Sequence, residues 1–209
     1  MHYEPLRVNR MLGAPEPYEF THGAASVCVY ALPDMDFIRE IPVGTKPDCH
    51  ALSGNGKWLY IATLDGLYAI SVEELAVRRV LDTGRVYATN VLPDGETMLV
   101  HDEEGGVLVL DGVGDAMTAR IRCRRQVLPE RKYRSEIGGK GSLIDGGRYY
   151  LCAGWHAARL FTLDTANDFA PAPFCEPDPR LDGGDDLVLN ADKTKAYVAC
   201  HRGASERGH

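Results

Sequence analysis

The chain has 209 residues, of which 44% are hydrophobic and 25% charged, and its 22 glycines indicate a globular protein with many turns rather than a disordered one. The formal net charge of -7 at pH 7 argues against nucleic acid or an anionic membrane as the main partner. No stretch approaches the ~18 consecutive apolar residues of a membrane-spanning helix, and residues 1–17 lack the apolar core of a signal peptide. We therefore expect a cytoplasmic protein.

Six cysteines are scattered along the chain without a C-x-x-C pair. Cys28, Cys123, Cys152 and Cys200 fall in strand-like runs, where a buried thiol behaves as a small hydrophobic group. We expect reduced cysteines with structural roles.

In chain order, residues 1–17 are expected to be an extension and residues 18–209 a single domain. Residues 27–44, VCVYALPDMDFIREIPVG, indicate two strands. Three units follow, each with four apolar or alternating runs separated by Gly/Asp turns, and then a fourth unit with two such runs. The expected strands are 50–53, 57–63, 67–72 and 77–84; 89–93, 97–102, 107–111 and 119–125; 142–145, 148–154, 159–164 and a Pro-rich return over 170–184; and 186–190 with 195–201.

These units form a repeat. Its second strands align at Tyr60, Leu99, Leu151 and Tyr197, which are 39, 52 and 46 residues apart. Periods of this length with several short strands are typical of β-propeller blades, whereas a helical repeat would need an apolar spacing that is absent here. We predict an all-β propeller of four-stranded antiparallel blades, about four of them in this chain.

Three ways to complete the wheel stay open. The strands in 27–44 and those in 186–201 can share one blade, which closes a four-bladed ring without exposed edges. Alternatively, YEFTHGAAS at 18–26 echoes YVACHRGAS at 197–205 and is itself a second strand. The chain is then either part of a larger wheel or one half of a homodimer with eight blades.

The stretch VGTKPDCHALSGNGKWLYIAT at 43–63 resembles the YVTN-type, lactonase-like β-propeller repeat. Asn55 stands where that repeat usually has Asp, and Gly54 where it has Pro. Weaker copies, LPDGETMLV and NADKTKAYVA, extend the resemblance over most of the chain after residue 20. The resemblance implies lactone hydrolysis, lyase-type elimination or redox chemistry at a bound metal or cofactor, but the motif itself specifies blade structure. The matching residues are Val43, Gly44, Pro47, Ser53, Gly56, Lys57, Tyr60 and Ala62.

In a propeller, the loops that join blades and the loops between second and third strands gather on one face. Five of the seven histidines map at or near that face, and the turns of the opposite face contain none; the five are His22, His50, His101, His156 and His201. Imidazoles and carboxylates that converge there suit zinc, copper, iron or manganese, or act as general acid and base. A histidine at a strand end, however, usually just satisfies backbone groups.

We assign candidate roles on this face. His50, Asp186 and His201 are the predicted catalytic residues. The predicted metal ligands are His50, His156, His201 and Asp185.

A long basic loop, RCRRQVLPERKYRSEIGGKGS, reaches the same face. Long loops in compact domains are often functional, and guanidinium groups suit carboxylate or phosphate. Together with Tyr87, the loop residues Arg134 and Lys140 are predicted to bind a small anionic or polar substrate. GGKGS is not a phosphate-binding loop, because Gly141 stands where Ser or Thr is required.

Three functions remain on sequence grounds. The first is a metal-dependent or acid/base enzyme of hydrolase, lyase or redox type. The second is a non-catalytic propeller that binds a protein or a small ligand, and the third is a structural subunit of a larger wheel.

Overall fold

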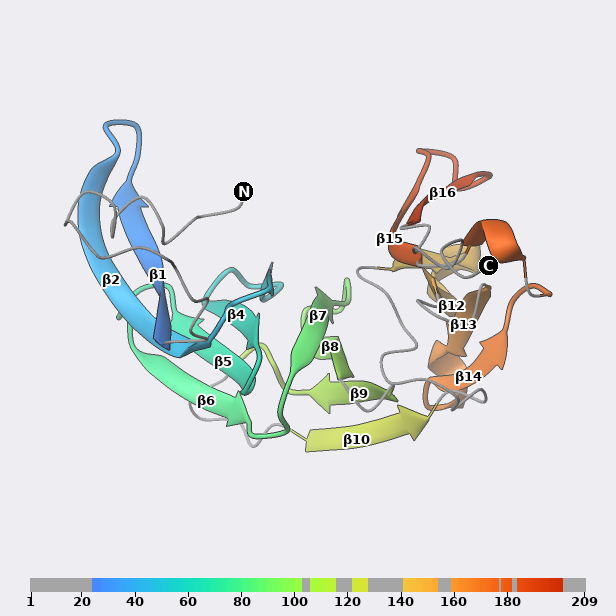
Figure 1. Cartoon of the computed structure of the whole chain (residues 1–209), viewed down its shortest axis with the longest axis horizontal. Coiled ribbons are helices and arrows are strands. Elements are labelled where there is room, and N and C mark those ends of the chain that lie inside the picture. Colours follow the sequence, from blue (N-terminus) through green and yellow to red (C-terminus); the bar gives the residue numbers. More distant parts are fainter. Residues whose placement is uncertain are drawn as a thin grey trace, which may run out of the picture.

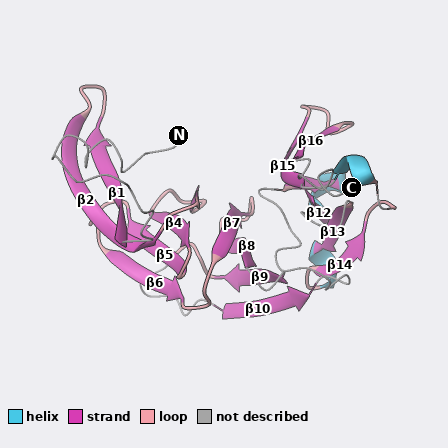
Figure 2. Ribbon diagram, in the orientation of Figure 1, coloured by secondary structure: helices cyan, strands magenta, loops and turns pink. Residues whose placement is uncertain are grey.

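The computed structural model describes residues 24–102, 106–115, 122–127, 141–153, 159–176, 178–181 and 184–200. Within these residues the chain forms sixteen β-strands and three short 3-10 helices, arranged as five antiparallel sheets. The sheets follow one another along an open arc (Figure 1), and strands dominate throughout (Figure 2). No helix in this described part is long and apolar enough to cross a membrane.

Three sheets are complete four-stranded blades, which confirms the predicted fold class. Blade 1 contains β3 (Cys49–Leu52), β4 (Trp58–Thr63), β5 (Gly66–Ser71) and β6 (Val77–Leu81). Blade 2 contains β7 (Val86–Val91), β8 (Thr97–Asp102), β9 (Gly106–Asp111) and β10 (Arg122–Val127). Blade 3 contains β11 (Ser142–Ile144), η1 (Asp145–Gly147), β12 (Tyr149–Ala153), β13 (Leu160–Asp164), η2 (Thr165–Asn167) and β14 (Ala170–Pro173).

Two further sheets have two strands each, and we call them half-blades. β1 (Ala24–Ala31) pairs with β2 (Asp36–Thr45), as predicted for 27–44. After the short helix η3 (Pro179–Leu181), β15 (Gly184–Leu189) pairs with β16 (Ala196–Cys200). Among the described strands the half-blades are not hydrogen-bonded to each other, and they lie at the two ends of the arc (Figure 1).

The strand register is the same in every unit. The first and second strands pair Ala51 with Tyr60, Asn90 with Leu99, and Val188 with Tyr197. Blade 3 pairs Ser142 with Leu151 in the same way. The four residues that define the repeat in the sequence therefore occupy one structural position.

The outer strand of blade 3 is proline-rich. β14 contains Pro171 and Pro173 and pairs only with β13. Proline lacks an N–H and is tolerated on an edge strand, so the predicted Pro-rich return begins as the fourth strand of its blade.

Tight turns join first to second strands. Asn55, Asp94 and Asp192 each accept a hydrogen bond from the backbone N–H two residues later, at 3.0, 3.0 and 3.1 Å. The following residue has positive φ: 71° at Gly56, 73° at Gly95 and 56° at Lys193. The Asx side chain stabilises the turn, and glycine favours the left-handed backbone, which explains the Asx/Gly pattern of the repeat.

Side chains of alternate residues pack between neighbouring blades. Tyr60 and Ala62 of β4 face blade 2 and join Met98 and Val100 in one core cluster. Leu99, between those two, faces blade 3 and packs with a second cluster that includes Tyr150, Cys152 and Phe161. A third cluster joins Ile41 and Val43 to Ile61 and Ile70. Among the aromatic side chains, Trp58, Tyr60, Tyr150 and Phe161 are buried and fill the spaces between blades.

Polar contacts also connect the blades. The Tyr60 hydroxyl donates to the Val113 carbonyl at 2.6 Å, and the Asn55 amide donates to the Gly114 carbonyl at 2.7 Å. A Cβ at Gly54 would clash with the Gly95 backbone, so the turns of blades 1 and 2 touch directly. We call the end of the blades that carries these turns the lower end. The connections between blades lie at the opposite end of the blades, which we call the upper end.

Candidate functional site

Among the predicted site residues, the structure describes His50, Asp185, Asp186 and Tyr87. His50 lies in β3, opposite Ile61, and is exposed. Asp186 lies in β15, is exposed, and accepts the Leu187 N–H at 3.0 Å. His50 belongs to the first complete blade and Asp186 to the last half-blade, on opposite sides of the arc (Figure 1).

Of the other six predicted site residues, two lie in described strands and four do not. Tyr87 lies at the irregularity of β7 between Val86 and Ala88, and Asp185 lies in β15. His156, His201, Arg134 and Lys140 lie outside the described residues. The predicted catalytic, metal and substrate sets therefore stay predictions.

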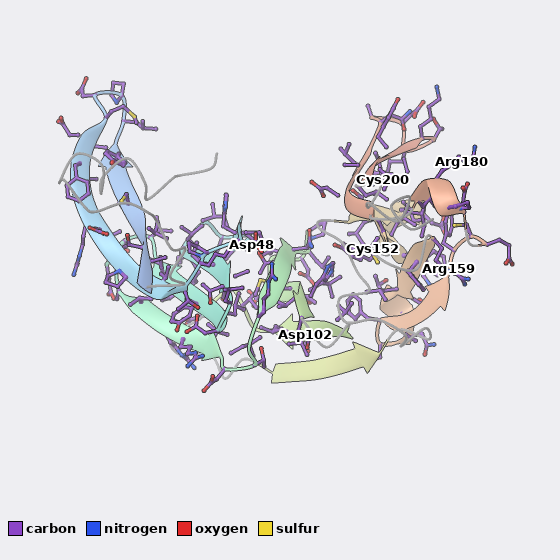
Figure 3. All side chains as sticks on the ribbon, viewed as in Figure 1. Asp48, Asp102, Cys152, Arg159, Arg180 and Cys200 are labelled. Carbon is purple, nitrogen blue, oxygen red and sulfur yellow. The ribbon has the colours of Figure 1, made fainter. Side chains whose placement is uncertain are left out.

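The upper end of β8 buries two titratable side chains in succession. His101 is 1% exposed and Asp102 is 2% exposed. Because neighbouring strand residues point to opposite faces, His101 shares the face of Leu99 toward blade 3, and Asp102 shares the face of Val100 toward blade 1. Figure 3 shows Asp102 within blade 2. The sequence pattern places His101 at this end of the blades and assigns it no role.

Polar contacts link the inner strands of blades 1 and 2 at the same end. Asp48 forms an ion pair with Arg85, with 3.4 Å between Oδ2 and the guanidinium nitrogen. The Cys49 thiol and the Thr89 hydroxyl are 3.6 Å apart. These contacts show how the first strands of adjacent blades meet near the axis.

A second polar group anchors the first half-blade to blade 1. Asp65 accepts hydrogen bonds from the Thr45 N–H at 2.7 Å, the Thr63 hydroxyl at 2.8 Å and the Tyr68 hydroxyl at 3.0 Å, and Arg79 lies beside it. Partial burial would raise the pKa of Asp65, but these hydrogen bonds and the Arg79 charge outweigh it and hold the pKa below its ordinary value. Both oxygens of the carboxylate accept hydrogen bonds from neighbouring residues, which indicates a structural role.

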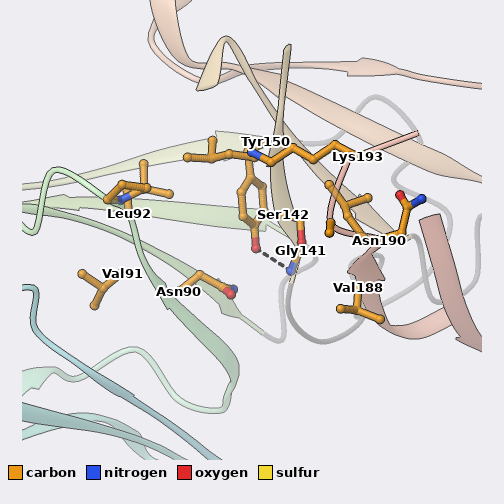
Figure 4. A pocket seen from close by; sticks show the side chains of 13 residues that line it. Asn90, Val91, Leu92, Gly141, Ser142, Tyr150, Val188, Asn190 and Lys193 are labelled. Atoms are coloured by element: carbon orange, nitrogen blue, oxygen red, sulfur yellow. Dashed lines mark hydrogen bonds between the residues drawn. The ribbon is translucent and has the colours of Figure 1, made fainter. Parts of the chain in front are cut away.

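A cavity of about 500 Å³ lies between the inner strands of blades 2 and 3 and the second half-blade. Its wall includes Pro93 and Lys193 from two first-turn segments, so part of it lies at the lower end of the blades. Figure 4 shows Lys193 among the side chains that line it. Its apolar wall consists of Val91, Leu92, Leu143, Val188 and Leu189, and its polar wall of Asn90, Ser142, Tyr150, Asn190 and Lys193.

Tyr150 places a hydroxyl on the cavity wall. Its oxygen accepts the Gly141 N–H at 2.7 Å (Figure 4), and among the described residues none accepts its own proton. Burial is the main cause that raises the pKa of Tyr150 well above its ordinary value, the Asp186 carboxylate adds to it, and the hydrogen bond from the Gly141 amide acts in the opposite direction. Tyr150 is therefore a neutral donor. Gly141 is required here, because a Cβ would press on the Tyr150 ring and the Leu151 carbonyl.

Other donors share this wall. The Asn90 amide nitrogen is buried and has no hydrogen-bond partner within the described residues. An unpaired buried donor costs about 1–3 kcal/mol, which an acceptor on a bound molecule can offset. Ser142 adds a hydroxyl and Lys193 an ammonium group. Asn190 is different, because its amide is used within its own turn by Lys195 and Thr194.

Sequence reasoning missed this cavity because it looked at the face with histidines. The signal lay in the first strands, where polar Asn90 and Ser142 stand at the positions that Ala51 and Val188 fill in other units. Spacing alone could not show that these positions border a common space.

The described cysteines agree with the predicted structural role. Cys28, Cys49, Cys152, Cys175 and Cys200 are free thiols. Burial raises the pKa of Cys152 to about 12, so it is not a thiolate at neutral pH. Within the described residues no group of three or more His, Cys, Asp or Glu side chains could hold a metal ion.

Comparison with known proteins supports the architecture. No family model and no curated protein matches the chain. Solved structures do: hydrazine synthase of Kuenenia stuttgartiensis (TM-score 0.57, 15% identity), the dihydro-heme d1 dehydrogenase NirN in complex with DHE (0.56, 20%) and the Cps50 (Swd1) β-propeller domain of Myceliophteria thermophila (0.61, 12%). The fold is a β-propeller.

The likeness covers 76%, 81% and 84% of this chain but 43%, 36% and 57% of those proteins, respectively. The chain thus spans roughly half, or less, of each neighbour's length. At these identities the propeller fold is shared, and the neighbours' activities are their own.

Proposed function

We propose that this propeller binds a small anionic or carbonyl-bearing molecule in the cavity between blades 2 and 3 and the second half-blade. The observation that carries the proposal is the donor-rich wall, on which the Asn90 amide and the Tyr150 hydroxyl lack acceptors among the described residues. Lys193 supplies a positive charge at the rim, and Val91 and Val188 supply apolar contact. Such walls favour a ligand with oxygen acceptors on a small carbon skeleton.

Isothermal titration calorimetry with acetate, malonate, citrate and inorganic phosphate tests the proposal. Lys193→Met should weaken binding about 10–100-fold, because a hydrogen bond to a charged group contributes ~1.5–3 kcal/mol. Lys195→Met is the matched control, since Lys195 belongs to the same turn but does not line the cavity. Equal affinities for the two variants, or no binding of any probe, would remove the cavity from consideration.

Acid/base or metal-dependent catalysis at the upper end is a second candidate function. It is favoured by the buried His101 and Asp102, which lie at the same end as His50 and Asp186. Here His50, Asp186 and His201 exchange protons, or His50, His156, His201 and Asp185 bind zinc, copper, iron or manganese. Two structural neighbours are named as a synthase and a dehydrogenase, which supports catalysis on this fold.

Elemental analysis of the purified chain, run with light scattering, tests the metal-dependent form. Near-stoichiometric metal that is lost in His50→Ala and His201→Ala would support it. A chain that stays metal-free after reconstitution would restrict the upper end to acid/base chemistry.

We also propose that the repeat is of the YVTN type. Support comes from the roles of the matching residues: Ser53 bonds to Asn55 and to the Trp58 N–H, Gly56 has positive φ, and Tyr60 is fully buried.

A further inference from the structure

The two half-blades together contain the strands of one blade. The turn between β15 and β16 closes with the Asn190 N–H on the Lys195 carbonyl at 3.1 Å, as Ser53 and Trp58 close the first turn of blade 1 at 2.8 Å. β15 and β16 are therefore first and second strands.

The other half-blade supplies the missing positions. Ala31 pairs with Asp36 across a turn whose penultimate residue, Met35, has a φ of 62°. In blade 1, Ser71 bonds to Ala76 across a turn of the same length, and Leu75 has a φ of 55°. β1 and β2 are therefore third and fourth strands.

The equivalence fixes a register between β16 and β1. Complete blades pair Trp58 with Ser71, Thr97 with Asp111, and Tyr149 with Asp164. In the half-blades, Lys195 precedes Tyr197 by two residues, as Trp58 precedes Tyr60. Ala31 stands directly before its turn, as Ser71 does. Lys195 and Ala31 are therefore the corresponding pair. Counting along antiparallel strands then places Tyr197 opposite Val29, Val198 opposite Cys28, and Ala199 opposite Val27.

The side-chain faces agree with this register. Val27 and Val29 pack toward blade 1. Tyr197 occupies the position of Tyr60, whose side chain faces the following blade, so Tyr197 and Val29 fall on the same face. A shift by one residue would place them on opposite faces.

Exposed apolar side chains lie where the joined sheet would cover them. Val188 is 62% exposed and Tyr197 57% exposed. On blade 1, Leu52 is 53% exposed and pairs with Leu59, on the face turned toward the first half-blade. Adding β15 and β16 to β1 and β2 would bring Val188 and Tyr197 toward Leu52.

The turns at the lower end carry opposite charges. Second and third strands are antiparallel neighbours. The turn that precedes the second strand and the turn that follows the third strand therefore lie at the same end of a blade. In the joined sheet, the turn with Lys193 and Lys195 would lie beside the turn with Asp34 and Asp36. This arrangement favours the pairing.

We propose that β16 of one copy of this chain pairs with β1 of a second copy, and that β16 of the second pairs with β1 of the first. The half-blades lie at opposite ends of an open arc (Figure 1), and a two-fold axis closes such a pair with two identical junctions. Six complete blades and two joined ones give eight in all, within the usual range of propellers.

The assembly also completes a pair of predicted site residues. Asp186 stands opposite Ala199, as Cys49 stands opposite Ala62; His50 stands opposite Ile61, as Thr89 stands opposite Val100. Cys49 and Thr89 meet across the junction of blades 1 and 2 with 3.6 Å between side-chain atoms. By equivalence, Asp186 of one copy meets His50 of the other, so the acid/base pair of the second candidate function forms between copies.

Cysteine cross-linking tests the register between β16 and β1. The result does not depend on whether the cavity binds a ligand. Val198→Cys, made with Cys200→Ser, should form a disulfide with native Cys28 of the second copy on mild oxidation. Hydrogen-bonded and non-hydrogen-bonded pairs alternate, so the neighbouring pair Ala199→Cys with Val27→Cys is tested in parallel. Ala199→Cys, likewise made with Cys200→Ser and with Val27 unchanged, is the matched control, because its side chain lies on the other face of the sheet from Cys28.

The expected product is a covalent species of twice the 23.0 kDa chain mass, and light scattering of the unmodified protein should give the same value. His50→Cys with Asp186→Cys should cross-link likewise, and Tyr197→Glu should yield single chains. A disulfide within one chain would contradict pairing between two copies and would show that a single chain closes into a ring. Cross-linking only in the control, or in no variant, would overturn the register itself.

Discussion

Blade 1 and the second half-blade contain the same turn between their first and second strands, but the strands that follow it have different surroundings. Asn55 and Asp192 each bond to the N–H two residues later, and Gly56 and Lys193 share a left-handed backbone. Yet Tyr60 is 0% exposed, whereas Tyr197, at the same position, is 57% exposed. The repeat therefore determines local strand and turn geometry, while burial depends on which blade stands beside the strand.

The largest effect should separate these two tyrosines. Tyr60→Ala should lower the free energy of unfolding by about 3–5 kcal/mol, because it removes a buried ring. Tyr197→Ala should change it by less than about 0.5 kcal/mol when the chain is dilute enough to be single. Urea unfolding followed by tryptophan fluorescence measures both. Similar losses in the two variants would mean that the half-blade is packed as a blade within one chain.

A smaller effect should separate the two turns. Gly54→Val should cost about 1–3 kcal/mol, because the added side chain meets the Gly95 backbone of blade 2. Ala191 is the equivalent residue and is exposed, so Ala191→Val should cost less than about 0.5 kcal/mol. Thermal unfolding midpoints provide the comparison, and an equal shift would contradict a direct contact between turns.

The smallest effect concerns the carboxylate that joins the first half-blade to blade 1. The pKa of Asp65 is held below its ordinary value, so its contribution is present above the unfolded pKa near ~3.9 and is lost as pH falls through the lower folded value. The side chain is 37% exposed, which limits the effect.

Urea unfolding of Asp65→Asn at pH 7 and at about pH 2 should show a deficit that disappears in acid. Glu73→Gln, an exposed change in the same blade, is the control. A deficit that is independent of pH would show that the charge of Asp65 is not responsible.

Much of the fold was predictable because short stretches of sequence determine the strands and turns of each blade. The run TMLVHD at 97–102 coincides with β8, and the alignment at Tyr60, Leu99, Leu151 and Tyr197 proved to be one register position. Alternating apolar residues and Asx/Gly turns act over a few residues, so a single sequence reveals them.

The candidate site was less accessible to sequence reasoning. The cavity depends on how far apart the inner strands of three sheets stand, a distance that no strand encodes alone. Tyr150 packs between blades as an apolar ring, and it also presents its hydroxyl to the cavity. His50 is a predicted catalytic residue and metal ligand, yet its surroundings depend on the strands that complete the adjoining half-blade.

The bonds from Tyr60 to Val113 and from Asn55 to Gly114 couple blade 1 to its neighbour, blade 2. In such an array, cooperativity is a property of neighbouring pairs, and the order of opening follows position along the arc. Amide hydrogens of β4 and β8 should exchange last, and those of β16 first. Engaging a second copy would remove that weak end and turn a graded opening into a single transition.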